Sequence, residues 1–438
     1  MTLLTENLSF AILFATFFQI ERKSKLLFYP VFSFIINLDQ NNTSMKFNAT
    51  HSLIRQLNRS AILDLIREEG PIARTTIANR LSISLPTVVR VVDELTKVDL
   101  VRVGGEIESG GGRPRTLIEF NTENSAVIGL DLGGTKMYGT IANLGGTIQR
   151  EVYETWGENG AENALEKVFE LTDNLLTTPL PQGQRIRGIG LGVPGVTFSD
   201  TGVVSWAPSL KWRNLQLKQI FEERYQVPVI VENDVNLAAL GEYGFGVARG
   251  ASSLVCMAIG TGIGAGIVID RKVYRGFHSS AGEVGYLPPD ISYLGRRYAD
   301  FGALESLASG TGIASRGREL KGIDQEQAFK DLTAEEIFDA ARGGQAWAKN
   351  VVEETVSYLS LVIAAISLLL DPEVIVLGGG VARSADVLIE PILENLEGVI
   401  PVVPHLVQSD LGYRATVLGA ILMVLDETTQ HVSIERLA

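Results

Sequence analysis

The sequence predicts an α/β protein with a small helical module in front of it, and three observations lead to this fold class. Segments before residue 120 carry apolar residues at helical spacing. After residue 125, apolar strand segments run three times into glycine-rich turns. Glycine accounts for 45 of 438 residues, above the average share of roughly 7%, and no G-X-Y repeat explains the excess.

Composition excludes several classes of protein. Hydrophobic residues make up 45% of the chain and charged residues 20%, which excludes global disorder. The single cysteine, Cys256, excludes a disulfide framework and a Cys-rich zinc site. A net charge of −13 argues against binding nucleic acid over the whole surface. Residues 45–120 carry 11 Lys and Arg against 9 Asp and Glu, so any DNA contact is expected in that segment.

Residues 1–44 differ from the rest of the chain. Their two apolar patches, 8–20 and 26–38, are each shorter than the ~18 residues that span a bilayer. The segment before the first patch has no basic residue, which a signal peptide requires. We therefore expect a non-native extension with the true start at Met45, no membrane partner and a cytoplasmic location. A membrane anchor is the alternative.

Three helices are predicted between residues 58 and 97. Asn58–Glu69 has an apolar stripe and ends at Gly70-Pro71. Thr75–Leu81 and Leu85–Lys97 follow, separated by the turn 82–84. This is the spacing of a helix-turn-helix whose recognition helix is Leu85–Lys97.

The recognition helix has residues that mark its start, residues expected to contact DNA and residues expected to pack inward. Ser84 is a candidate N-cap, and Pro86 suits the first helical position. Thr87 and Arg90 lie near the N-terminal end, which enters the major groove in such domains. The residues expected to pack inward are Val88, Val91, Val92 and Leu95.

A two-stranded wing is predicted after this helix. Strands 100–103 and 116–120 flank a glycine-rich tip that leads into Arg113 and Arg115. An arginine between Gly and Pro can enter a narrow A·T minor groove. Residues 45–120 therefore predict a winged helix-turn-helix domain that binds a DNA operator. The alternative is a protein-contact module in which both arginines are merely solvated, since a net charge of +2 is modest.

The first α/β element is the strand Ala126–Leu130, which leads into Asp131–Lys136 and a second strand, Met137–Ala142. A Gly-Gly-Thr turn (Gly133, Gly134, Thr135) lets backbone amides approach phosphate oxygens. Asp131 at the strand end could hold a hydrated Mg²⁺. Alone this is weak evidence, because glycine is common in hairpins.

Two further elements strengthen the prediction. The strand Val255–Ile259 leads to a second glycine turn and the strand Ile267–Ile269, which repeats the first arrangement about 130 residues later, as in a duplicated fold. The strand Val374–Leu377 leads to a third turn that can pass close under a nucleotide. ATP with Mg²⁺ is therefore a candidate cofactor. The expected phosphate-loop residues are Gly260, Thr261, Gly262 and Gly264 in the second turn and Gly378, Gly379 and Gly380 in the third.

Polar residues cluster where the strand that begins at Val229 ends. Asn233 and Asp234 precede an Ala/Leu-rich helix, Val235–Tyr243. Carboxylates at strand ends of α/β folds tend to face the ligand crevice, so Asp234 is a candidate general base and Asn233 a candidate sugar ligand. The alternative is that both residues simply cap the helix.

With these motifs the chain from about Met45 onward resembles the ROK family (repressors, open reading frames and kinases), in its transcriptional-regulator branch. The resemblance implies a two-lobed, actin-like (ribonuclease-H-like) ATPase fold over residues 121–438, with a sugar between the lobes, and a homodimer or homotetramer. The matching motifs are Asp131–Lys136, Gly190–Gly195, Glu232–Asn236, Gly260–Gly266, Ala281–Gly285 and Gly378–Gly380.

The resemblance also implies roles for single residues. Asp234 corresponds to the catalytic base that takes a proton from a sugar hydroxyl, and Lys136 belongs to the first phosphate motif. Buried carboxylates and amides suit geometry-specific hydrogen bonds to vicinal hydroxyls. The implied sugar-binding residues are Gly195, Asn233, Asp234, Glu283, Tyr286 and Glu305.

One departure from the family pattern concerns zinc. Tyr286 stands where the family commonly has a His that binds both zinc and sugar, and the loop 287–303 contains neither Cys nor His. We therefore expect no zinc and a different sugar contact near Tyr286.

Two functions follow from the sequence. The first is a sugar-responsive transcriptional repressor of carbohydrate metabolism. The alternative is an ATP-dependent sugar kinase, since the phosphate loops and Asp234 are retained. The apolar stretch Val351–Leu370 contains Glu353 and Glu354 and is expected to be a buried helix instead of a membrane span.

Overall fold

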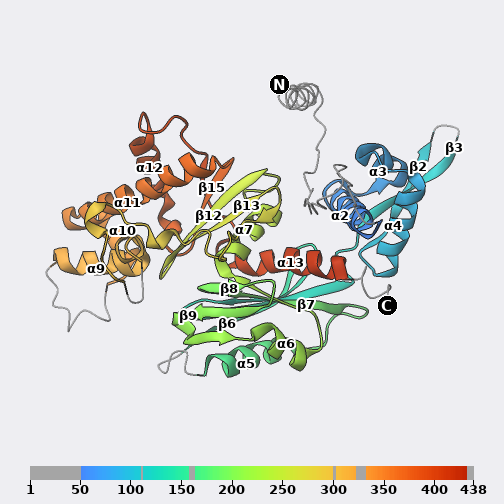
Figure 1. Ribbon diagram of the computed structural model, residues 1–438, viewed down its shortest axis with the longest axis horizontal. Coiled ribbons are helices and arrows are strands. Elements are labelled where there is room, and N and C mark those ends of the chain that lie inside the picture. The colour runs from blue at the N-terminus through green and yellow to red at the C-terminus, as the bar shows by residue number, and fades with distance from the viewer. Residues whose placement is uncertain (1–50, 110–111, 157–162, 299–301, 322–331, 432–438) are drawn as a thin grey trace, which may run out of the picture. The chain divides into compact units, whose positions relative to one another are not determined.

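The computed structural model describes residues 51–109, 112–156, 163–298, 302–321 and 332–431 (Figure 1). The chain divides into two compact units, Met1–Ile54 and Arg55–Ala438. Only residues 51–54 of the first unit are described, so the account below concerns the second. The segment 1–44 and two glycines of the predicted wing tip, Gly110 and Gly111, lie outside the described residues.

The N-terminal module is a winged helix-turn-helix, as predicted. Its three helices are followed by a β-hairpin, and a short strand between the first two helices adds to that hairpin through Ile72 paired with Ile118. This two-residue strand has no periodicity of its own and could not be predicted. The elements are α2 (His51–Glu69), β1 (Ile72–Ala73), α3 (Arg74–Leu81), α4 (Leu85–Lys97), β2 (Val101–Ser109) and β3 (Gly112–Phe120).

The recognition helix α4 has the predicted bounds and the predicted buried face. Its inward side chains Val88, Val91, Val92 and Leu95 are fully buried. Ser84 is the N-cap residue of α4, as predicted, although its side chain makes no capping hydrogen bond. The Ser84 hydroxyl bonds to Thr87 Oγ1 at 2.8 Å, and no backbone amide of the helix donates to it.

Two five-stranded sheets of identical topology form the larger body, which confirms the predicted duplication (Figure 1). In each, an antiparallel three-stranded meander continues into two parallel strands. The first, in spatial order, is β11 (Val229–Asn233), β7 (Arg185–Val193), β4 (Ser125–Leu132), β5 (Lys136–Asn143) and β6 (Ile148–Thr155). The second is β14 (Lys272–Val273), β13 (Ile263–Ile269), β12 (Ser253–Ile259), β15 (Val374–Gly378) and β16 (Leu406–Gln408).

Each sheet has its own helices and its own apolar core, so the body has two lobes. Lobe 1 is the first sheet with α5 (Ala164–Leu176), α6 (Leu217–Tyr225) and a small sheet of β8 (Val196–Phe198), β9 (Val203–Ala207) and β10 (Trp212–Leu215). Lobe 2 is the second sheet with α8 (Glu305–Ala308), α9 (Gly310–Lys321), α10 (Ala334–Arg342), α11 (Ala346–Leu370) and α12 (Ile389–Leu396).

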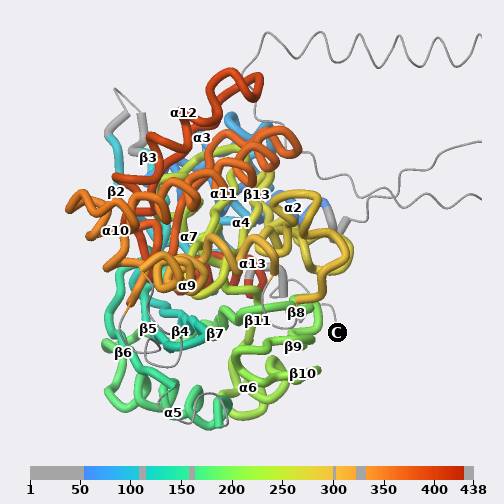
Figure 2. Tube along the Cα trace, turned by 90° about the vertical axis from the view of Figure 1, so that its left-hand side faces the viewer, coloured from blue at the N-terminus to red at the C-terminus, as the bar shows by residue number. Residues whose placement is uncertain are grey.

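Two helices, α7 (Asp234–Phe245) and α13 (Ala415–His431), lie between the two sheets in both views (Figures 1 and 2). Close approach requires glycine in the strands beneath them. A side chain at Gly192 of β7 would meet Thr416 of α13 at 2.4 Å, and one at Gly266 of β13 would meet the Val235 carbonyl of α7 at 2.3 Å. Gly192 therefore serves helix packing as well as belonging to the predicted motif.

The long apolar helix α11 is a core helix, as predicted. It is long and apolar enough to cross a membrane by length and composition alone. However, it packs into the core of lobe 2 through fully buried side chains such as Val351, Leu359 and Ile363. A helix that buries one face against its own domain needs no bilayer.

Candidate functional site

The junction of β11 and α7 carries the predicted catalytic base, Asp234, and a predicted sugar ligand, Asn233. Asn233 is the N-cap of α7, because its Oδ1 accepts hydrogen bonds from the Val235 and Asn236 amides, each at 3.0 Å. Its Nδ2 donates to the Gly195 carbonyl at 3.2 Å. The capping alternative is therefore correct for Asn233. It does not exclude a ligand contact, since a carboxamide nitrogen carries two hydrogens.

Four carboxylates from four separate elements influence one another electrostatically. Asp131 lies at the end of β4 and Asp234 at the start of α7, Glu283 precedes a short 3₁₀ turn, and Glu305 begins α8. Asp234 raises the pKa of Asp131 and of Glu283, and Glu305 also raises that of Glu283. The structure thus brings together the predicted base and two predicted sugar ligands with Asp131.

Burial is the main cause of the raised pKa values of Asp131 and Asp234. Burial, with the Asp234 charge adding to it, raises the pKa of Asp131 to about 8. Burial raises the pKa of Asp234 to about 6, although a hydrogen bond from the Val235 amide opposes the rise. A carboxylate with a pKa near 6 is largely ionised at neutral pH and still basic enough to accept a proton, as a general base requires.

Glu305 is tied to the second glycine turn. Its carboxylate accepts hydrogen bonds from the Ile263 amide at 2.9 Å and the Gly302 amide at 3.1 Å. Burial raises the pKa of Glu305 and these two hydrogen bonds partly offset the rise. A side chain at Gly262 would overlap the carboxylate at 1.8 Å, so the Glu305 side chain would have to move out of its present position. The carboxylate predicted to bind sugar therefore also fixes the predicted phosphate turn.

The predicted phosphate loops are only partly loops. Gly133, Gly134 and Thr135 form a turn held by Trp156, whose indole donates to the Gly133 carbonyl at 2.7 Å. The side chain of Lys136, at the start of β5, lies 5.5 Å from the Tyr153 ring.

In the second element, Gly260, Thr261 and Gly262 lie in the turn. The expectation that Gly264 belongs to this turn is wrong, because β13 begins four residues earlier than predicted and pairs Gly264 with Ala258.

The third glycine element also differs from the prediction, because one of its glycines belongs to a strand. Gly378 is the last residue of β15, paired with Ala258, whereas Gly379 and Gly380 are exposed in the turn. Gly379 has a left-handed φ of 82° and lies against the Ile259 backbone, which only glycine tolerates. Both turns therefore approach the same end of β12.

The donor set at Asp131 and Asp234 suits a hard divalent cation. The two carboxylates are partly buried, and the charge of Asp234 raises the pKa of Asp131. No cationic side chain among the described residues lowers either pKa, and Mg²⁺ prefers oxygen ligands. Among the described residues, no group of three or more His, Cys, Asp and Glu side chains is placed to hold a metal by itself. The pair fits a cation that shares its coordination with nucleotide phosphates and water. Asp131 would be its protein ligand.

The side chain of Tyr286, which stands where the family commonly has a His, points toward solvent. Tyr286 is 55% exposed, and burial together with the charges of Glu283 and Glu305 raises its pKa. It is therefore close to two predicted sugar ligands while one face stays open.

Sequence reasoning missed a buried ion pair beside Asp234. Glu232 of β11 is 1% exposed, and its Oε2 accepts from Arg275 Nε at 2.7 Å and from Ser199 Oγ at 2.7 Å. Its Oε1 accepts from the Asn233 amide at 2.9 Å and from Asn236 Nδ2 at 3.0 Å. The available signal was a charged residue inside an otherwise apolar strand, which is rarely buried without a partner.

The predicted DNA-contacting residues lie in α4 and β3 of the winged helix-turn-helix. Arg90 of α4 and Arg115 of β3 are exposed, and Thr87 is partly buried by its bond to Ser84. Arg113 lies in β3, and its side chain is outside the described residues.

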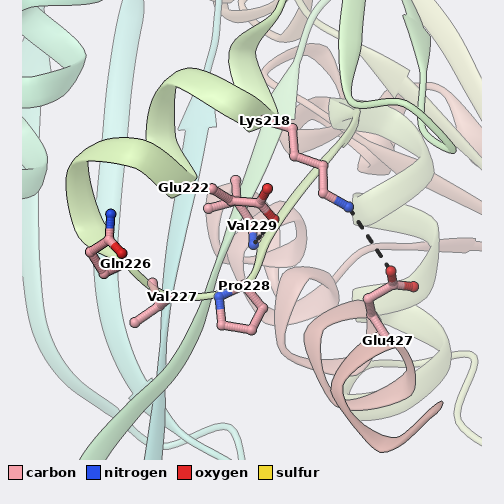
Figure 3. Close-up of a pocket in the computed structure, with 7 residues that line it drawn as sticks. All are labelled: Lys218, Glu222, Gln226, Val227, Pro228, Val229 and Glu427. Atoms are coloured by element: carbon pink, nitrogen blue, oxygen red, sulfur yellow. Dashed lines mark hydrogen bonds and ion pairs between the residues drawn. The ribbon is translucent and has the colours of Figure 1, made fainter. Parts of the chain in front are cut away.

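A separate pocket lies at the opposite end of β11 from Asp234 (Figure 3). Its polar groups already have partners: Lys218 lies 4.0 Å from Glu427, and Glu222 accepts from the Val229 amide at 3.3 Å. No predicted site residue lines it. The lining residues are Lys218, Glu222, Gln226, Val227, Pro228, Val229 and Glu427.

Comparison with known proteins agrees with this architecture. The sequence profile of the ROK family matches residues 127–427. The chain belongs to the ROK family. The xylose repressor of Caldicellulosiruptor bescii is 31% identical over 393 residues, which cover 86% of this chain and 97% of that protein.

Two solved ROK structures resemble the protein. A ROK family transcriptional regulator, described as a homolog of the Escherichia coli MLC protein, has a TM-score of 0.75 at 25% identity and covers 87% of this chain and 99% of its own. A ROK family glucokinase from Streptomyces griseus, solved with glucose and AMPPNP, has a TM-score of 0.59 at 26% identity and covers 68% of this chain and 98% of its own. The regulator matches over a larger share of this ROK protein than the kinase does.

Proposed function

We propose that this ROK protein is a cytoplasmic, sugar-responsive transcriptional repressor of carbohydrate metabolism. The observation that carries the proposal is a winged helix-turn-helix ahead of the two ROK lobes. The similarity to the Caldicellulosiruptor bescii xylose repressor extends over both parts and covers 97% of that protein. A sugar bound at Asn233, Asp234, Glu283 and Glu305 would change the DNA affinity of the module. Because helix-turn-helix proteins read two half-sites, we propose a homodimer or homotetramer.

The DNA-binding role makes a specific prediction. Arg90→Ala should weaken operator binding about five- to thirtyfold, or 1–2 kcal/mol, because it removes an exposed guanidinium from the N-terminal half of α4, the part expected to enter the groove. Lys97→Ala is the matched control, since Lys97 is exposed at the other end of the same helix and should change affinity little. Equal effects of both variants on a DNA-shift titration would contradict the assignment.

The experiment that tests the repressor is a DNA-shift assay with the promoter region of its own gene. D-xylose, D-glucose and N-acetyl-D-glucosamine would be added in turn, with D-xylose first because of the xylose repressor relative. One sugar should weaken the specific complex. A specific complex that responds to no pentose, hexose or amino sugar would overturn the proposal.

The alternative function is an ATP-dependent sugar kinase, and the site favours it in one respect. In-line phosphoryl transfer needs a phosphate cradle, a divalent cation and a positioned base, and Gly133–Thr135, Asp131 and Asp234 have the chemistry for these parts. ATP bound with Mg²⁺ would supply the transferred phosphoryl group. Asp234, with its pKa raised to about 6, would accept the sugar hydroxyl proton.

A coupled assay for ADP release over the same sugars distinguishes the two functions. Turnover with one sugar that Asp234→Asn abolishes would establish the kinase. Turnover that survives Asp234→Asn would refute the catalytic role of Asp234. No turnover, with one sugar releasing DNA, would leave the ROK lobes as a sensor.

A further inference from the structure

The DNA-binding module contacts the two lobes in different ways. Its buried apolar residues, including Ile62 and Ile66 of α2, form one continuous cluster with Val127 of β4, Ile230 of β11 and Leu418 of α13. Strands β4 and β11 belong to lobe 1, and α13 packs closely on the same sheet through Gly192. Apolar packing therefore fixes the module to lobe 1.

An ionic contact with lobe 2 comes from one turn of its sheet. Arg271 donates to Glu68 Oε1 of α2 at 2.5 Å and lies 3.7 Å from Asp64 Oδ2. It stands in the two-residue turn between β13 and β14, where Asp270 and Arg271 both have left-handed φ angles of 50° and 66°. Such a tight turn follows the twist of its strands and moves with them.

The other end of the same hairpin reaches the candidate sugar site. The first residue of β13, Ile263, donates its amide to Glu305 at 2.9 Å. Two residues after β14, Arg275 pairs with Glu232 of lobe 1 at 2.6 Å, next to Asn233 and Asp234. We call β13, the Asp270–Arg271 turn and β14 the coupling hairpin.

We propose that the coupling hairpin transmits sugar binding to the DNA-binding module through the Arg271 contact with Glu68 and Asp64. The inference rests on the proposed repressor function and names the regulation of that same site. Sugar bound to residues of both lobes, Asn233 at the end of β11 and Glu305 at the start of α8, changes the position of lobe 2 against lobe 1. Because the module packs on lobe 1, any such movement displaces Arg271 from α2 and removes a restraint on the helix that precedes the recognition unit.

The mechanism needs a differential contact, because a ligand shifts an equilibrium only through a difference between two states. Here the difference is an ion pair made when the lobes are in the present arrangement and lost or exchanged after they move. The charges are partly buried, with Arg271 and Asp64 each 28% exposed, so solvent does not fully screen the contact.

The test is the ratio of DNA dissociation constants with and without the sugar that acts on the wild type in the three-sugar panel. Couplings of this kind are typically about 5- to 150-fold. Arg271→Gln should bring the ratio close to 1 while sugar affinity, measured by calorimetry, stays within about twofold. Lys272→Gln is the matched control, since it removes the same charge from the next, exposed residue of the hairpin and should keep the wild-type ratio.

A double variant with the two charges exchanged distinguishes a loss of coupling from a loss of folding. The double variant Arg271→Glu with Glu68→Arg should recover much of the ratio that Arg271→Glu alone loses. A wild-type ratio in Arg271→Gln, or an equal loss in Lys272→Gln, would overturn the coupling hairpin and leave the repressor function standing. A wild-type protein whose DNA binding responds to no sugar would overturn both.

Discussion

Arg275→Met is expected to lower the free energy of unfolding by about 3 kcal/mol, because it leaves a buried carboxylate without its cation. Glu232 is 1% exposed, and the Arg275 guanidinium reaches it through Nε at 2.7 Å and through a terminal nitrogen at 2.6 Å. Breaking a buried pair from one side costs more than the pair itself contributes, since the remaining charge keeps its desolvation cost. Urea unfolding at pH 7 measures the loss.

Two further variants isolate the cause. Arg80→Met removes an arginine whose 3.4 Å partner, Glu69, is 40% exposed, and exposed pairs contribute only about 0–1 kcal/mol. The double variant Arg275→Met with Glu232→Gln removes the orphaned charge and should recover more than half of the loss. If Arg275→Met and Arg80→Met lower the free energy of unfolding equally, the Arg275–Glu232 pair contributes no more to stability than an exposed pair does.

The same pair connects stability to the site. Arg275 comes from the segment after β14 in lobe 2, whereas Glu232 and Ser199 belong to lobe 1. Glu232 also accepts the Asn233 amide, so it fixes the end of the strand from which Asp234 projects. Loss of Arg275 should therefore weaken sugar binding as well as folding, although Arg275 itself was not among the predicted sugar ligands.

Patterns that repeat over several residues allowed most of the fold to be predicted. The bounds of α4 match the prediction because a proline in its first turn and an apolar stripe act on the same helix. The three strand–glycine elements occur as predicted because buried strands need continuous apolar runs, and these are visible in one dimension. The repeat of one strand–glycine–strand arrangement about 130 residues later predicted the duplicated strand order.

The parts that could not be predicted depend on contacts between distant residues. Gly264 was placed in a turn, but pairing with β12 extends β13 back to Ile263. The Arg275–Glu232 pair joins residues 43 positions apart, and the Arg271–Glu68 pair joins residues 203 apart. No periodicity records such partners, so a lone charge in an apolar strand was the strongest available sign.

Stability should fall as pH rises, and Asp131 should be responsible for much of the fall. The pKa of Asp131 is raised to about 8 and that of Asp234 to about 6, from ordinary values near 4. Below pH 4 the folded and unfolded chains both hold these protons. Between pH 4 and 8 the unfolded chain releases them first, so unfolding is favoured progressively, and the stabilisation is lost as pH passes the folded values.

Asp131→Asn should therefore stabilise the ligand-free protein by about 2 kcal/mol at pH 8 and flatten the dependence of unfolding free energy on pH between 5 and 8. We expect less than the full shift implies, because the side chain is partly exposed and its charge is partly screened. Asp200→Asn is the control, since Asp200 is an exposed turn residue and should leave the profile unchanged. Urea titrations at four pH values measure both.

A stabilising Asp131→Asn variant would indicate that the carboxylate is retained for a ligand at a cost in stability, as functional sites commonly are. The ligand can then be tested directly. MgATP should raise the melting temperature of the wild type and of Asp200→Asn, because binding to the folded state alone stabilises it. It should not raise that of Asp131→Asn. If MgATP stabilises Asp131→Asn as strongly as wild type, Asp131 is not the cation ligand and its burial needs another cause.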